Sequence, residues 1–306
     1  MEGGFRIIDK ISQTKNIKLN FKNILIPISS EYYSKEVLRR SVKLAEKFKI
    51  KINLIYIIEE KTLNQVDKRQ DSLRTQHDID QTKKDIIDEQ KKSADKIIFE
   101  QAKNYLEKNK INFTSKTIEG EFSKVIKNET DKNKYQLVLM SFAKECVLRY
   151  RLLDELKINA PVWIEEGGKA ETILAICSNL APNQKVPGFS MKLAEILDLK
   201  LQFLYIVDIE DSVEVDNKGE RSEITSEKKL MYNANTFSEE IKKKGYQIKI
   251  VKGGTERQII KAASEIKNPL IIIGRNKKRK GIFGIPIKKF KKRLVERCND
   301  TIIFLN

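Results

Sequence analysis

The amino-acid sequence contains an internal repeat with an offset of 149 residues. Segment 24–30 returns at 173–179, segment 41–45 at 190–194 and segment 51–57 at 200–206, all in one register. The repeated unit is far longer than the roughly 20 to 50 residues of a solenoid repeat, and it has the size of a whole domain. We therefore expect the 306 residues to fold as two copies of one domain.

Each half alternates short apolar runs with amphipathic segments of helical period, and Ser34 is the expected N-cap of the first helix. Strands are expected at 22–28, 52–58, 113–118, 137–140 and 161–164, and in the second half at 173–177, 201–207, 247–251, 270–273 and 302–305. Helices are expected at 31–48, 79–109, 122–130 and 146–156, and then at 186–197, 226–244, 257–264 and 288–297. This order predicts an α/β fold: two tandem, doubly wound domains, each with a mostly parallel five-stranded sheet.

The predicted boundaries are an N-terminal extension at 1–20, a first domain at 21–165, a linker at 166–170 and a second domain at 171–306. Gly167 and Gly168 mark the linker. No run of about 18 apolar residues is present, so no transmembrane segment is expected. The beginning of the chain does not resemble a secretory signal. The three cysteines are widely spaced, which favours a reducing compartment, so we expect a cytoplasmic protein.

The residue types required for nucleophilic catalysis are sparse. His77 is the single histidine, so no Ser-His-acid arrangement can be built around Ser29, Ser30 or Ser178. We expect these serines to cap the turns that follow their strands. Carboxylates follow the second strand of each half, at Glu59, Glu60, Asp208 and Glu210. We expect them to face water, and we predict no metal site and no enzyme activity.

The net charge of +17 includes one concentrated patch. Between Arg275 and Arg293 there are ten basic residues and no acidic one, whereas the rest of the second half has 16 basic and 17 acidic residues. Clustered lysine and arginine neutralise phosphate groups without reading a sequence. The patch therefore indicates contact with an anion, although a solvated lysine-rich surface is also compatible with it.

The order of elements resembles the universal stress protein family over nearly the whole chain from Phe21 onward. The resemblance is carried by the proline-containing first strand at 24–30, the helix end at 43–45 and the strand–glycine–helix–strand segments. Those segments include Glu119-Gly120 with 135–140, and 252–254 with 269–274. It implies an adenine nucleotide alpha hydrolase-like fold, a stress-related binding function and ATP or AMP as ligand. It also implies pairing of last strands across a two-fold axis. The halves are thus expected to form an intrachain pseudo-dimer with Trp163 at the interface, and a further homodimer is possible.

Nucleotide-binding members of that family have an aspartate after the first strand and a phosphate loop of pattern G-x2-G-x9-G-S/T after the fourth. Here Ser29 and Ser178 stand at the aspartate position, and the first-half loop, from Ser141, has no glycine. The resemblance therefore implies that only the second half keeps a phosphate loop. The nucleotide- or phosphate-binding candidates are Ser178, Val207, Gly274, Lys277, Gly281, Gly284, Lys288 and Lys289. The other basic residues of the anion patch are Arg275, Lys278, Arg279, Lys280, Lys291, Lys292 and Arg293.

The sequence leaves three functions open. The first is a non-catalytic stress-related binding or regulatory protein with weak adenine-nucleotide binding in the second half. The second is a binder of nucleic acid or anionic membrane through residues 275–293. The third is a nucleotide-dependent hydrolase on a similar fold, which requires a base or metal cluster near the strand ends.

Overall fold

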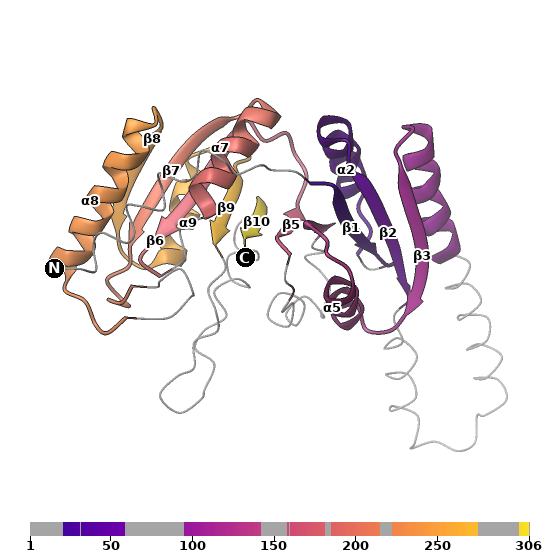
Figure 1. Ribbon diagram of the computed structural model, residues 1–306, viewed down its shortest axis with the longest axis horizontal. Helices are drawn as coiled ribbons and strands as arrows, with labels where there is room; N and C mark the ends of the chain where they lie inside the picture. The colour runs from indigo at the N-terminus through magenta and orange to yellow at the C-terminus, as the bar shows by residue number, and fades with distance from the viewer. Residues whose placement is uncertain are drawn as a thin grey trace, which may run out of the picture. The chain divides into compact units, whose positions relative to one another are not determined.

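The structure is a computed structural model, shown in Figure 1, and it describes residues 21–30, 32–58, 95–141, 158, 160–180, 185–214, 222–274 and 300–305. These residues fall into two compact units, Phe21–Ala160 and Pro161–Asn306, which we call the first and the second unit. Each is considered by itself. The predicted helices at 146–156 and 288–297 lie outside the described residues, as does the beginning of the predicted helix at 79–109.

The first unit contains a parallel sheet in the order β3-β2-β1-β4. Its strands are β1 (Asn23–Ile28), β2 (Lys51–Ile58), β3 (Phe113–Glu119) and β4 (Leu137–Ser141). Its helices are α2 (Lys35–Phe48), a helix at 95–108 and α5 (Phe122–Lys132). Strand β1 pairs with both β2 and β4, so it lies in the interior of this sheet and is buried throughout, apart from partial exposure at Asn23.

Helix α2 begins where the sequence predicts. The Ser34 side chain accepts a hydrogen bond from the Glu36 amide at 3.2 Å, which satisfies one of the free donors of the first turn. The predicted apolar positions of this helix, among them Val37, Leu38 and Leu44, are buried. The helix ends at Lys49, which takes a left-handed conformation with φ of 51°.

The second unit contains a six-stranded sheet in the order β5-β10-β9-β6-β7-β8. Its strands are β5 (Val162–Glu165), β6 (Thr172–Ser178), β7 (Lys200–Val207), β8 (Gln247–Lys252), β9 (Leu270–Gly274) and β10 (Thr301–Leu305). Its helices are α7 (Lys185–Leu197), α8 (Glu227–Lys243) and α9 (Thr255–Ser264). The strands pair in parallel except β5, which runs antiparallel to β10 with Trp163 opposite Ile303.

The two units repeat one topology, which confirms the predicted α/β class. The order β3-β2-β1-β4 in the first unit corresponds to β8-β7-β6-β9 in the second. One turn is also repeated in the two units. Gly120 and Gly253 have φ of 145° and 130°. The Gly120 amide donates a hydrogen bond to the Ile58 carbonyl, and the Gly253 amide donates one to the Val207 carbonyl, both at 3.0 Å. Only glycine tolerates such φ values readily, so both copies require it there.

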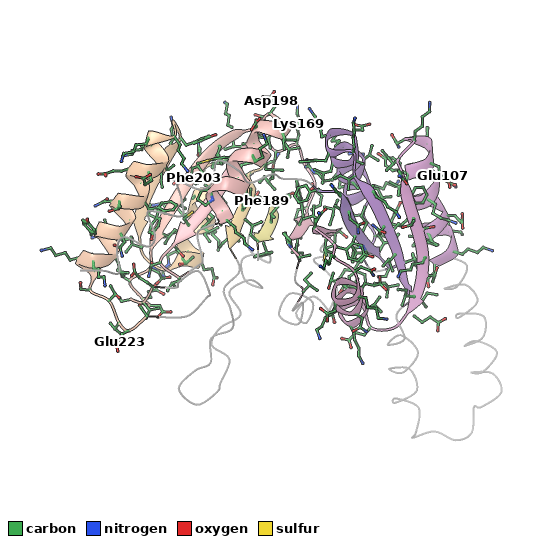
Figure 2. All side chains as sticks on the ribbon, in the orientation of Figure 1. Glu107, Lys169, Phe189, Asp198, Phe203 and Glu223 are labelled. Atoms are coloured by element: carbon green, nitrogen blue, oxygen red, sulfur yellow. The ribbon has the colours of Figure 1, made fainter. Side chains whose placement is uncertain are left out.

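Each unit buries its own apolar core between the sheet and its helices. In Figure 2, Phe189 of α7 and Phe203 of β7 lie within the second unit, whereas Asp198 and Glu223 lie at its periphery. Among the described residues, no helix has the length and apolar character needed to cross a membrane.

The first unit ends at Ala160, so the strand predicted to close the first domain is grouped with the second unit as β5. Trp163, in this strand, is fully buried, and its indole donates a hydrogen bond to Glu165 at 3.0 Å. The predicted domain limits at 165 and 171 stay a prediction, and so does the pseudo-dimer.

Candidate functional site

Three of the predicted ligand residues come together at one end of the second unit's sheet. Ser178 ends β6, Val207 ends β7 and Gly274 ends β9. Strand β6 pairs in parallel with both β7 and β9, so the three ends lie side by side. We call this the carboxyl edge of the second unit. Ligands of open parallel α/β sheets bind at such edges.

The serines at the first strand of each unit cap the turns that follow them, as predicted. The Ser178 Oγ accepts a hydrogen bond from the Leu180 amide, and the Ser29 Oγ accepts one from the Tyr32 amide, both at 3.2 Å. Both serines are buried. Their role in the described structure is therefore to hold the turn.

Asn179 fixes the segment that follows β7. Its Oδ1 accepts a hydrogen bond from the Asp208 amide at 2.7 Å. Its Nδ2 donates to the carbonyls of Val213 at 2.8 Å, Asp208 at 3.2 Å and Asp211 at 3.3 Å. The side chain is 5% exposed, so these bonds are shielded from water. One carboxamide thereby holds both ends and the middle of segment 208–213.

Asp208 does not face water, and the sequence-based expectation for this carboxylate is wrong. It is 5% exposed, and it accepts hydrogen bonds from four donors. Its Oδ1 accepts from the amides of Glu210 and Asp211 at 3.0 and 3.2 Å, and its Oδ2 accepts from the amide and hydroxyl of Thr255 at 2.8 and 2.6 Å. Thr255 is the first residue of α9, so this carboxylate satisfies donors at the positive end of a helix.

Glu210 is exposed, as predicted, but its carboxylate also lies at the start of α9. A Cβ on Gly254, the N-cap residue, would be 2.7 Å from the Glu210 Oε1. The N-terminus of α9 therefore already has two carboxylates of the protein beside it. In the described parts of the chain, no group of histidine, cysteine, aspartate or glutamate residues is arranged to hold a metal ion.

The side chains behind this edge are not suited to nucleophilic chemistry. Cys177 is fully buried, and burial raises the pKa of its thiol. Burial is the main cause that raises the pKa of Tyr205, and the nearby Cys177 and Glu214 add to it. The Tyr205 ring packs against Phe237, with the ring centroids 5.2 Å apart. Both groups are therefore held in the neutral form, and a neutral thiol is a poor nucleophile.

Aromatic side chains pack at the corresponding end of the first unit. The ring of Tyr32, 1% exposed, stacks on Phe122 of α5 with centroids 4.3 Å apart. The Tyr56 hydroxyl donates to Asp95 at the start of helix 95–108. Burial, and secondly the bond to Asp95, raises the pKa of Tyr56. Ser141 ends β4, at the position that Gly274 has in β9.

The remaining predicted residues lie outside the described residues. They are the loop candidates Lys277, Gly281, Gly284, Lys288 and Lys289, the anion patch Arg275, Lys278, Arg279, Lys280, Lys291, Lys292 and Arg293, and also His77, Glu59 and Glu60. Sequence reasoning missed Asn179 and Thr255. Asn179 could have been found because it directly follows a strand-end serine. Thr255 could have been found because it follows the Gly253-Gly254 pair.

Comparisons with known proteins agree with this architecture. Residues 20–153 match the family model described as the Universal stress protein family. A universal stress protein from Archaeoglobus fulgidus DSM 4304 has a similar structure, with a TM-score of 0.62 and 12% sequence identity, covering 94% of this chain and 98% of that one. A functionally unknown protein from Pseudomonas aeruginosa PAO1 has a TM-score of 0.59 and 13% identity, covering 93% and 92%. At such identities the likeness shows the fold alone. No curated protein matches the chain. Through residues 20–153, the chain therefore resembles the universal stress protein family.

Proposed function

We propose that the chain is a non-catalytic binding protein whose second unit takes ATP or AMP weakly, while its first unit takes none. The observation that carries this proposal is the difference between the two sheet ends. In the second unit Ser178, Val207 and Gly274 end adjacent strands. At the equivalent end of the first unit, Tyr32 and Phe122 stack and are buried.

The proposed phosphate position follows from the charges beside α9. A helix N-terminus attracts phosphate, but this one already has the Asp208 carboxylate bonded to Thr255 and Glu210 beside Gly254. A phosphate there would meet like charge. We therefore propose that the phosphate binds in the segment after Gly274, whose sequence offers Gly281 and Gly284 as candidate backbone donors and Lys277, Lys288 and Lys289 as candidate charges.

A hydrolase is less well supported. A general base must be able to reach the proton it removes. The buried carboxylate at this edge, Asp208, already accepts four hydrogen bonds from the protein. Binding without turnover fits these contacts better.

Calorimetry with ATP and AMP at about 50 and 200 mM salt tests the proposal. Lysines bind phosphate as point charges, and exposed charge is screened over about 8–10 Å near physiological salt. Affinity should therefore fall steeply with salt and fall further in the double variant Lys277→Ala, Lys288→Ala. The control is Lys228→Ala with Lys229→Ala, which removes two exposed lysines from α8. Salt-independent binding that survives the first double variant would contradict the proposal.

The alternative is a polyanion binder that uses residues 275–293 without a nucleotide site. The ten basic residues of that stretch favour it. Single-stranded DNA added to the ATP titration separates the two. If DNA binds with a steep salt slope while ATP and AMP give no heat at either salt concentration, the polyanion function replaces the proposed one.

A further inference from the structure

The two copies differ at the residue that follows the strand-end serine. In the first copy this residue is Ser30, and in the second it is Asn179, 149 positions later. A serine side chain has one donor and a short reach, whereas the asparagine carboxamide has two N–H donors and one carbonyl acceptor. Asn179 uses all of them, on partners that lie between 29 and 34 residues away in the sequence.

These bonds set the backbone beside the candidate site. Val207 ends β7, and the segment held by Asn179 begins at the next residue. Because the Asp208 amide and the Val213 carbonyl both bond to one carboxamide, the two ends of the segment are held beside Asn179, the residue that follows β6. With Asn179 shortened to serine, the carbonyls of Asp208, Asp211 and Val213 would all lose this donor.

The same network reaches α9. The Asn179 side chain accepts a hydrogen bond from the Asp208 amide and donates one to the Asp208 carbonyl. The Asp208 carboxylate in turn bonds to the amide and hydroxyl of Thr255. A change at Asn179 therefore alters the position of Asp208 and, through it, the first turn of α9.

We propose that Asn179 is a positioning residue for ligand binding at the carboxyl edge of the second unit. This inference rests on the proposed function. Asn179 is 5% exposed and acts through segment 208–213, which it holds in the arrangement that the ligand meets beside Val207. The serine at the equivalent position of the first copy lacks the groups for this role, which agrees with a site in one copy only.

The test uses Asn179→Ser, which introduces the residue of the first copy. The control is Asn133→Ser, which removes another carboxamide with two hydrogen bonds, to the backbone and side chain of Glu129 in the first unit. We expect Asn179→Ser to weaken ATP binding roughly tenfold, because several net contributions from hydrogen bonds are lost, and the control to leave it unchanged.

Amide hydrogen exchange distinguishes a local change around Asn179 from a general loss of stability, which would speed exchange throughout the second unit. In Asn179→Ser, the amides of Asp208, Glu210, Asp211 and Thr255 should exchange roughly tenfold faster or more, while α7 exchanges as in the unsubstituted protein. In the control these four amides should not change.

The outcomes separate the two claims. If the unsubstituted protein binds ATP and Asn179→Ser binds it equally well, the positioning role is refuted and the proposed function stands. Equal affinity refutes it even if the four amides exchange faster. If the unsubstituted protein binds neither ATP nor AMP, the proposed function fails and the positioning role fails with it.

Discussion

Replacing Asp208 by alanine removes the carboxylate that joins the end of β7 to the start of α9. Four donors lose their acceptor, and the two on Thr255 make the shortest bonds, at 2.8 and 2.6 Å. A hydrogen bond to a charged group contributes about 1.5–3 kcal/mol, and the exposed donors recover part of this from water. Counting mainly the two Thr255 bonds, we expect Asp208→Ala to lower the free energy of unfolding by about 3–5 kcal/mol.

Differential scanning calorimetry measures this loss as a lower melting temperature. For a folding unit of this size, 1 kcal/mol corresponds to about 2–4 °C, so the transition that includes the second unit should fall by about 6–20 °C. Glu195→Ala is the control, because Glu195 pairs with Lys192 at 2.7 Å on the exposed face of α7 and should cost under about 1 kcal/mol. A loss below about 1 kcal/mol for Asp208→Ala would mean that this network does not hold the carboxyl edge.

Three further predictions concern single residues. Ser34→Ala should lower the stability of the first unit by about 1 kcal/mol in urea unfolding, since it removes the N-cap bond of α2, and an unchanged midpoint would contradict this. Gly253→Ala should cost about 1–3 kcal/mol in the same assay, because φ is 130°, a backbone conformation that residues with a Cβ rarely adopt; the nearest atom to the new Cβ, the Gln258 Nε2 at 2.8 Å, ends a flexible side chain that can move away. Gly245→Ala, with φ of 83° and open space, should cost a similar amount. Burial and the nearby Glu129 raise the pKa of Tyr135 to about 12, so the folded state favours the neutral phenol. That stabilisation is complete below about pH 10 and is lost as pH rises toward 12, and the tyrosinate absorbance lost in Tyr135→Phe should titrate near 12 rather than 10.

The regular part of the fold could be predicted because it depends on local pattern. The apolar runs at 22–28 and 270–273 became β1 and β9, and the periodicity after Ser34 became α2. The 149-residue repeat predicted that the two sheets share a strand order, and they do.

The contacts that shape the two sheet ends could not be predicted, because they join residues far apart in the sequence. Asp208 meets Thr255 across 47 residues, and Asn179 meets Val213 across 34. In the sequence around it, each of these residues looks like an ordinary polar loop residue. The stacking of Tyr32 on Phe122 likewise depends on how β1 and α5 pack. The sequence around each of these two residues gives no indication of that packing.

We infer that a single copy of the duplicated fold binds the nucleotide, and photocrosslinking with 8-azido-ATP can locate the binding copy. The protein is irradiated at low salt with and without excess ATP, and labelled peptides are identified by mass spectrometry. We expect ATP-competed labelling within 171–306 and none within 21–160. Competed labelling in the first unit, or labelling that excess ATP does not reduce, would contradict it.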